Sequence, residues 1–461
     1  MSAVRGRRIA SKAGARISEH RLDNGLIVLL AERHHDPVVA VMVWYRVGSR
    51  DEEEREAGVS HFLEHMMFKG TRRFGKGEID RVTTELGGSN NAFTGPDHTA
   101  YWFEFASDRW EKALEIEADR MGHLLLDPGE FEAEKKVVLE ELSMGDDDPW
   151  RTLSREMQLA LFRRHPYRRP VIGFTDSLKA LSAADMRDYY ERFYRPDNAV
   201  LVVSGDFEPA QALAAVRKHF GALLLAPKRA AKTAGRARSS FRPSIDAPTG
   251  QQRLEVRWDD EGQRLCMAWP TSAVATDDDW TLDLVSIVLA GGKLSRLFRR
   301  LVVEERLATT VSCQNDTRVE GGVFWIFAEA AQGVEPAVLE RAIDAEIERL
   351  ATQDVPSVEL ARAKRLIVAG EAHDSETVSD IAEDLGEFAV DARWQLALEA
   401  RDRVTAVTAR AVRECVARLL RPERRVIGWC LPKNGVRVKA VRKGAKLPAN
   451  GPKGVRRVRR S

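Results

Sequence analysis

Residues 58–70 read GVSHFLEHMMFKG, and the interpretation of the whole chain begins from this stretch. In a helix, His61, Glu64 and His65 occupy positions i, i+3 and i+4, so their side chains project from one face. Two neutral imidazoles on one face can hold a zinc ion, and a carboxylate between them can reach a water on that ion without becoming a ligand. The alternative interpretation of these five residues alone is a surface helix that carries two histidines.

The order His-x-x-Glu-His is the inverted form of a common zinc-site motif, and a catalytic zinc needs three protein ligands and one open position. A carboxylate on a neighbouring helix would complete the set. Residues 131–142 read FEAEKKVVLEEL and predict a helix in which Glu134 and Glu141, seven residues apart, face the same side. Without the histidine motif, a salt-bridged surface helix would be the better interpretation of this segment.

The pattern of predicted elements in the first half of the chain returns in the second half. Apolar, β-branched runs predict the strands, and amphipathic periodicity with Gly, Asn and Pro boundaries predicts the helices. The continuous run 38–47, VVAVMVWYRV, indicates a sheet covered on one or both faces. The predicted strands are 22–31, 38–47, two within 89–106, 198–206, 254–258, 265–270, 309–313, 322–329 and 425–430. The predicted helices are the motif helix, 76–86, 108–123, 131–142, 152–163, 209–220, 278–290, 336–352 and 357–371, with more helix as far as 420.

Composition divides the chain into two domains with a linker and two basic ends. Residues 227–250 are rich in Ala, Arg, Ser and Pro without apolar periodicity, which is typical of a linker. We therefore predict a basic N-terminal tail at 1–18, a zinc-binding domain at 19–226 and a second, similar domain without a metal site at 251–435. A basic C-terminal tail follows at 436–461.

The net charge of +2 conceals a strong segregation of charge. The two ends hold 15 of the 72 Lys and Arg residues and no acid, so 19–435 contains 57 bases against 70 acids. An acidic body attracts cationic ligands and repels nucleic acid, so we expect no nucleic-acid partner. The apolar runs are too short for a membrane span, and residues 1–18 lack the apolar centre of a secretory signal. We expect a bacterial cytoplasmic location, with the mitochondrial matrix as the alternative because the start is rich in Arg and free of acids.

The motif and its spacing resemble the pitrilysin/insulinase family of inverted-motif zinc proteases, whose smaller members include mitochondrial processing peptidase. In that family, the third ligand is a Glu about 76 residues after the second His, within a Glu-x6-Glu helix. His65 plus 76 is Glu141, and Glu134 begins the same pattern. The resemblance implies that His61, His65 and Glu141 hold one zinc ion. It also implies that Glu64 is the base that activates the water and that Glu134 orients a ligand. Glu140 is the competing third ligand, but it points about 100° away from the Glu134 side.

The resemblance covers about residues 19–431 and implies an α+β fold of two similar domains, each a mixed sheet flanked by helices. The stretch Asn91, Ala92, Phe93 and Thr94 resembles the family's edge strand, which binds an extended substrate by backbone pairing. In a chain without the metal site, Asn91 would be read as a turn residue.

The second half departs from the family pattern. Many members carry an Arg followed seven residues later by a Tyr, the pair that steadies the substrate carbonyl and the oxyanion. Val302 and Thr309 occupy the aligned positions, so the family's Arg and Tyr are both replaced. Since a donor to the oxyanion contributes about 3–4 kcal/mol, we expect a related partner chain to supply the pair in a heterodimer. A homodimer in which Arg299, Arg300 or another donor substitutes is the alternative.

These observations predict a zinc-dependent endopeptidase that cleaves extended oligopeptides in a closed chamber, as the zinc-bearing subunit of a dimer. The acidic body predicts a preference for basic peptides. The alternative from another functional class is a non-catalytic scaffold or assembly subunit of a larger complex. A scaffold has no need of His61, Glu64, His65 and Glu141 together, which argues against it.

Overall fold

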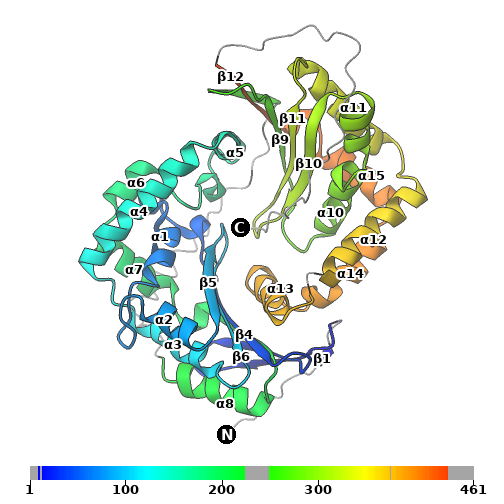
Figure 1. The fold of residues 1–461 in the computed structure, drawn as a ribbon. Helices are drawn as coiled ribbons and strands as arrows, with labels where there is room; N and C mark the ends of the chain where they lie inside the picture. The colour runs from blue at the N-terminus through cyan, green and yellow to red at the C-terminus, as the bar shows by residue number, and fades with distance from the viewer. Residues whose placement is uncertain are drawn as a thin grey trace.

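Two mixed β-sheets organise the chain, one in each half (Figure 1). The computed structural model describes residues 9–10, 13–223, 245, 248, 250–373 and 375–433. The first sheet has seven strands in the order β1-β2-β3-β7-β4-β6-β5, and the second has five in the order β10-β11-β9-β12-β8. The first-sheet strands are β1 (Ile9–Ala10), β2 (Arg16–Arg21), β3 (Ile27–Glu32), β4 (Val38–Tyr45), β5 (Ser89–Thr94), β6 (Thr99–Ala106) and β7 (Ala199–Gly205). The second-sheet strands are β8 (Gln252–Trp258), β9 (Arg264–Pro270), β10 (Ala308–Asp316), β11 (Val323–Ala330) and β12 (Val426–Pro432).

The two sheets repeat one topology. In the first, β3 is parallel to β7, and β7, β4, β6 and β5 then follow with antiparallel pairing. In the second, β8 is parallel to β12, and β12, β9, β11 and β10 follow in the same way. The predicted fold class, α+β with two similar mixed sheets flanked by helices, is confirmed. By this correspondence, the substrate-strand candidate β5 and strand β10 are the matching edge strands of the two sheets.

The helices lie between and outside the sheets. In the first half they are α1 (Val59–Met66), α2 (Glu78–Glu85), α3 (Glu111–His123), α4 (Pro128–Asp146), α5 (Pro149–Leu161), α6 (Thr175–Ala180), α7 (Ala183–Phe193) and α8 (Pro209–Phe220). In the second half they are α10 (Asp277–Ala290), the π-helix η5 (Phe298–Glu304), α11 (Pro336–Thr352), α12 (Ser357–His373), α13 (Val378–Asp391), α14 (Leu396–Ala406) and α15 (Ala409–Leu419). In the described part of the chain, no helix combines the length and the apolar composition that crossing a bilayer requires.

Strand β4 is buried on both of its faces, the fuller of the two covers that the run 38–47 allowed. Val41 and Val43 point into the core that the first sheet shares with its own helices. Met42 and Trp44 point to the opposite face, where they meet α13. Because successive side chains of a strand alternate between faces, a run without polar residues needs a cover on each side.

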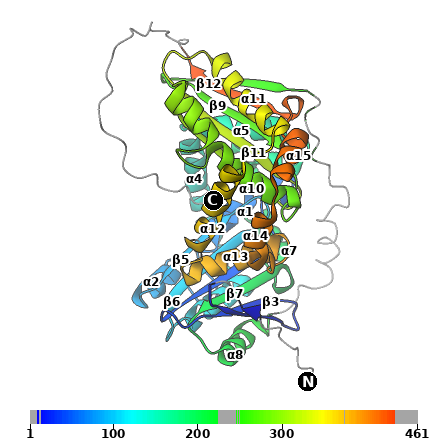
Figure 2. The same cartoon turned by 90° about the vertical axis from the view of Figure 1, so that its right-hand side faces the viewer.

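One helix from each half of the chain packs on the sheet of the other half. Helix α13 belongs to the second half in sequence, yet it packs on the first sheet, where Ile381, Ala382 and Leu385 are buried (Figures 1 and 2). In return, Leu153 and Met157 of α5 pack on the second sheet. The two halves therefore share apolar cores and do not touch merely at their surfaces.

Part of the predicted N-terminal tail, residues 1–18, forms β-strands instead. Residues 16–18 begin β2, and β1 pairs antiparallel with β2. Only Ile17 is buried in β2, so the segment lacks the apolar alternation that would have indicated a strand. The predicted linker 227–250 lies outside the described residues except for 245, 248 and 250, and the predicted C-terminal tail 436–461 lies wholly outside them.

Candidate metal centre

Helix α1 carries the histidine motif and starts at a glycine that no other residue can replace without strain. Gly58 has a φ of 96°, and a Cβ there would stand 2.6 Å from the carbonyl oxygen of Ile172. The first turn is capped by the buried carboxyl group of Glu52, which accepts hydrogen bonds of 2.9 Å from the backbone nitrogens of Gly58 and Ser60. Burial raises the pKa of Glu52 to about 8. The acidic segment before the motif thus provides a cap that holds the start of α1 in place.

The structure brings three of the predicted residues together. One side-chain atom each from His61, His65 and Glu141 lies within 4.8 Å of the others. Nε2 of His61 is 3.8 Å from Oε1 of Glu141, and Nε2 of His65 is 3.6 Å from Oε2. The carboxylate of Glu141 therefore faces both imidazoles from α4, while Glu140 is exposed and lies outside this group.

The protonation of the two imidazoles suits a bound cation. Nδ1 of His65 lies 2.9 Å from Oε1 of Glu134, and a carboxylate only accepts, so Nδ1 donates. In the neutral ring, Nε2 of His65 then presents a lone pair toward Glu141. Burial, and next the neighbouring His65, lower the pKa of His61 to about 4, so this imidazole is neutral at neutral pH. Lone pairs and a carboxylate that face one another repel unless a cation lies between them, so the donor set fits a zinc ion.

Glu134 lies where the family resemblance implies a carboxylate that orients a ligand. Its Oε1 accepts from His65, and its Oε2 lies 2.6 Å from Nζ of Lys69. Burial opposes ionisation, but the hydrogen bonds from Lys69 and His65 hold the pKa of Glu134 below its usual value. This carboxylate therefore stays charged and fixes the tautomer of His65. Sequence reasoning missed Lys69, since nothing in its local pattern indicates a contact with a residue 65 positions later.

Glu64, the predicted base, lies on the same face of α1. One oxygen of its carboxylate accepts a hydrogen bond from β5, the strand that is predicted to bind substrate. The hydroxyl of Thr94 donates to Oε2 of Glu64. Burial raises the pKa of Glu64, against the lowering effects of the Thr94 hydrogen bond and of His65. A raised pKa suits a group that must take up a proton and release it again. Sequence reasoning assigned Thr94 to substrate binding and missed this contact with the base.

Asn91, Ala92, Phe93 and Thr94 lie on β5, which is the edge strand of the first sheet beside α1. Oδ1 of Asn91 accepts from the backbone nitrogen of Ala92. An edge strand keeps one row of backbone groups outside the ladder of its sheet, which is what pairing with an extended peptide requires. Pairing of a peptide with these residues stays a prediction.

Known proteins resemble both halves of this chain. Residues 27–174 match the family described as Insulinase (Peptidase family M16), and residues 180–367 match the description Peptidase M16 inactive domain. The zinc protease PqqE of Helicobacter pylori is 30% identical over 369 residues, which cover 78% of this chain and 80% of that protein. The chain belongs to the M16 peptidase family.

Other M16 relatives extend the likeness. An uncharacterized zinc protease of Mycobacterium leprae is 33% identical over 70% of this chain and 72% of its own length. The crystal structure of a protease from Helicobacter pylori superposes with a TM-score of 0.84 at 26% identity, covering 91% of this chain and all of that one. A structure described as a peptidase M16 inactive domain from Pseudomonas fluorescens has a TM-score of 0.81 at 19% identity over 90% and 98% of the two chains, and shows the shared fold.

Two residues that depart from the family pattern, Val302 and Thr309, lie on neighbouring elements of the second M16 domain. Val302 lies in η5, and Thr309 lies at the start of β10, where the register with β11 shifts. The hydroxyl of Thr309 donates to the backbone oxygen of Glu329. Arg299 is paired with Glu304, and Arg300 is paired with Glu305 and Glu346. The two arginines that could replace a missing donor are therefore each held by carboxylates of their own domain.

Proposed function

We propose that this chain is a zinc-dependent endopeptidase that cleaves extended oligopeptides. The observation that carries the proposal is the convergence of His61, His65 and Glu141 beside the half-buried carboxyl group of Glu64. When bound, zinc would polarise the scissile carbonyl and lower the pKa of a water molecule. The rest of the chemistry falls to side chains of this chain.

Glu64 takes one proton from the attacking water and returns it to the nitrogen of the leaving amine as the peptide C–N bond breaks. The hydroxyl of Thr94 donates to Oε2 of this carboxylate and orients it. Glu134 keeps His65 in the tautomer whose Nε2 faces Glu141. The backbone of Asn91–Thr94 would hold the substrate as an added strand, so recognition would depend more on an extended backbone than on particular side chains.

We further propose that the active form is a dimer with a closed chamber, in which a related chain supplies the Arg and Tyr that Val302 and Thr309 replace here. The heterodimer is favoured over a homodimer that relies on Arg300, because this arginine pairs with the buried carboxylate of Glu346. Full peptide hydrolysis by the purified chain alone would contradict the requirement for a partner.

The test of the main proposal compares the wild type with Glu64→Gln, each with and without candidate partner chains. We expect both proteins to retain stoichiometric zinc, and the variant to lose hydrolysis of a quenched fluorescent peptide. Glu130→Gln is the matched control, because Glu130 pairs with Lys76 and lies outside the group of His61, His65 and Glu141. Unchanged hydrolysis in Glu64→Gln would overturn the role of the base. Absence of zinc from the wild type would favour a scaffold subunit.

A further inference from the structure

The tips of two hairpins, one from each half of the chain, meet beside the substrate-strand candidate β5. The turn of residues 95–98 joins β5 to β6, and the loop of residues 317–322 joins β10 to β11. Oδ2 of Asp97 accepts a hydrogen bond of 3.0 Å from the backbone nitrogen of Val319, which is a direct contact between the two tips. The second half of the chain therefore touches the turn that follows Thr94, the last residue of β5.

Several buried hydrogen bonds converge on Asp97, which is only 5% exposed. Its Oδ1 accepts from the hydroxyl of Tyr167 at 2.7 Å and from the guanidinium group of Arg50. The hydroxyl oxygen of Tyr167 in turn accepts from the backbone nitrogen of Glu320 at 3.0 Å. Asp97 and Tyr167 thus bind consecutive amides of the 317–322 loop, and charge-assisted hydrogen bonds in a buried site are strong and directional.

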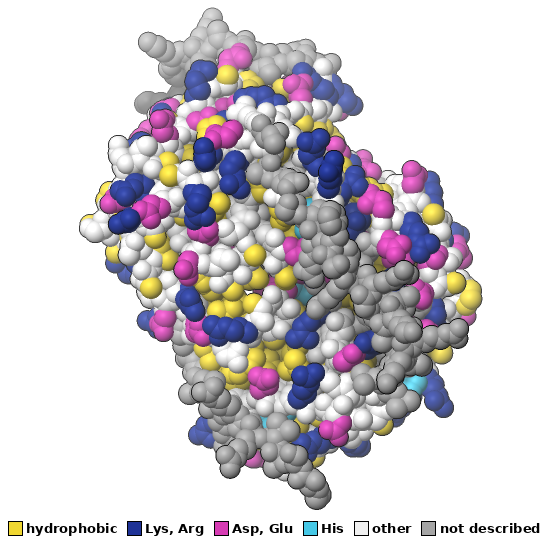
Figure 3. All heavy atoms as spheres, turned by 180° about the vertical axis from the view of Figure 1, so that it is seen from behind, with side chains coloured by type: hydrophobic (Ala, Val, Ile, Leu, Met, Phe, Trp, Pro, Cys, Tyr) yellow, Lys and Arg dark blue, Asp and Glu magenta, His cyan; other side chains and the backbone are white. Residues whose placement is uncertain are grey.

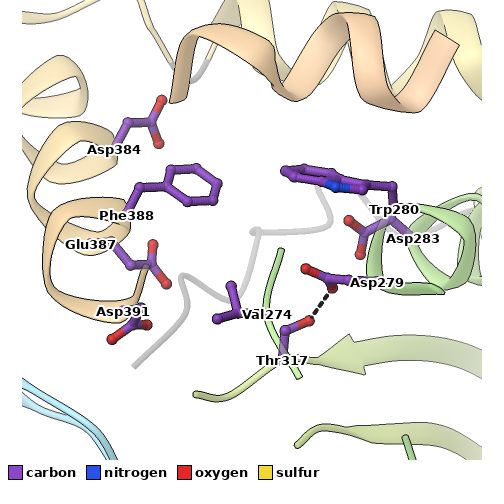
Figure 4. A pocket seen from close by; sticks show the side chains of 9 residues that line it. All are labelled: Val274, Asp279, Trp280, Asp283, Thr317, Asp384, Glu387, Phe388 and Asp391. Atoms are coloured by element: carbon purple, nitrogen blue, oxygen red, sulfur yellow. Dashed lines mark hydrogen bonds between the residues drawn. The ribbon is translucent and has the colours of Figure 1, made fainter. Parts of the chain in front are cut away.

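The second half of the chain holds this turn at two adjacent residues. The hydroxyl of Thr317 donates to Oδ1 of Asp279 at 2.6 Å, drawn as a dashed line in Figure 4, so the loop is anchored to α10. On the other side of the same cavity of about 110 Å³ lies Asp391 of α13 (Figure 4). Oδ1 of Asp391 is 3.0 Å from Nδ1 of His98, the residue that follows Asp97. The turn is therefore fixed to two separate elements of the second half.

The position of this turn matters because Thr94 donates to Oε2 of Glu64, the proposed base. The backbone nitrogen of Gly95 donates to the backbone oxygen of His98 at 2.8 Å and closes the turn directly behind Thr94, so a displacement of the turn displaces Thr94 as well. Figure 3 shows basic and acidic side chains interspersed on an exposed face, where water and salt screen their interactions. The contacts of Asp97 are buried, so they are screened much less.

We propose that Asp97 and Tyr167 are positioning residues, through which the second half of the chain holds β5 and keeps Thr94 on the base. The inference rests on the proposed peptidase function and gives the domain without a metal site a part in the reaction. That domain acts by fixing the strand that carries Thr94, without contact with the reacting atoms. Neither Asp97 nor Tyr167 belongs to the group of His61, His65 and Glu141, so zinc content should not depend on them.

Amide hydrogen exchange tests the hold on β5 without any measurement of hydrolysis. Tyr167→Phe removes the hydroxyl that joins Asp97 to the loop, and we expect exchange of the segment 89–98 to accelerate about tenfold with zinc content unchanged. Asp97→Asn, whose NH₂ group cannot accept, should act in the same direction. Tyr190→Phe is the matched control, because its hydroxyl is also buried and also makes backbone hydrogen bonds, but to α3. The control should exchange in 89–98 as the wild type does.

A double-mutant cycle tests whether the hold on β5 reaches the base. Thr94→Val and Tyr167→Phe should lower kcat for a quenched fluorescent peptide by about tenfold and about fivefold, respectively. If Tyr167 acts through Thr94, the double variant should be no slower than Thr94→Val alone. Losses that multiply to about fiftyfold would overturn the proposal, since independent effects combine in that way.

Unchanged exchange of 89–98 in both Tyr167→Phe and Asp97→Asn would also overturn the proposal, whatever the kinetics. A wild type that hydrolyses no peptide would contradict the peptidase function, and accelerated exchange in the two variants would then still support the hold of the second half on β5. The two failures are therefore distinguishable.

Discussion

Glu134→Gln is the sharpest test of how α4 supports the metal centre. In the wild type, the Glu134 carboxylate accepts from His65 at 2.9 Å and from Lys69 at 2.6 Å, and its side chain is only 10% exposed. The amide of Gln retains one oxygen but loses the charge, and its NH₂ group cannot accept. At least one of the two contacts is therefore lost, and the Lys69 ammonium group is left near His65 without its counter-charge.

The size of the effect follows from these contacts. A hydrogen bond to a charged group contributes about 1.5–3 kcal/mol, and loss of the carboxylate that orients a ligating histidine lowers metal affinity by about 10–100-fold. We expect the zinc dissociation constant to rise by that factor at fixed pH. The pKa of Glu134 lies below its usual value, so the group is ionised throughout the neutral range and the effect should be independent of pH there.

The assay is competition for zinc against a chromophoric chelator, with circular dichroism to verify the fold. Glu130→Gln makes the same chemical change one turn earlier on α4, where the carboxylate meets Lys76 at 2.7 Å. The control should bind zinc as the wild type does. A Glu134→Gln protein that folds and also binds zinc within about threefold of the wild type would refute the orienting role, since the expected loss is about tenfold or more.

Three further changes probe other contacts. Thr94→Val removes the hydroxyl that binds Glu64, the proposed base, and keeps the shape of the side chain. We expect kcat to fall about tenfold with zinc content unchanged, and Thr94→Ser to restore it. Gly386→Ala places a Cβ 2.0 Å from Nε1 of Trp44, so we expect α13 to be displaced from the first sheet at a cost of about 3 kcal/mol in urea unfolding. Burial opposes protonation of His98, but Asp391 raises its pKa to about 9. Because the pKa of His98 is higher in the folded state, its charged form stabilises the protein fully below about pH 6.5, and this stabilisation is lost as the pH rises through 9. The free energies of unfolding of wild type and His98→Gln should therefore converge by up to about 3 kcal/mol over that window. Parallel pH profiles of the two proteins would contradict this.

Much of the fold could be predicted from local patterns. The run 38–47 indicated a strand in a sheet covered on one or both faces, and the structure shows that both are covered, since Val43 and Trp44 lie in two different cores. Helix α8 has the predicted bounds, because Pro209 marks its start and the apolar period ends at Phe220. Strand β2 and helices α6 and α7 were missed. In β2 the reason is that one buried residue is too weak a signal.

The arrangement of the metal centre was predictable because it depends mainly on helical geometry. His61 and His65 share a face at one-turn spacing, and Glu134 and Glu141 share another at two-turn spacing, whatever the rest of the fold does. That the two faces meet could not be derived from spacing alone, and it was expected only from the family resemblance. Lys69 and the hydroxyl of Thr94 join the site through contacts that have no sequence pattern.

The sequence by itself determined which residues can act and which share a face, because backbone periodicity sets the direction of each side chain. Only the tertiary structure decided which faces meet. It placed α13 of the second half on the first sheet and α5 of the first half on the second sheet. It also gathered Asp283, Trp280 and Glu387 around one cavity. These contacts join residues far apart in the chain, and they form because apolar faces must be buried, a requirement that many alternative pairings of the same elements could have met.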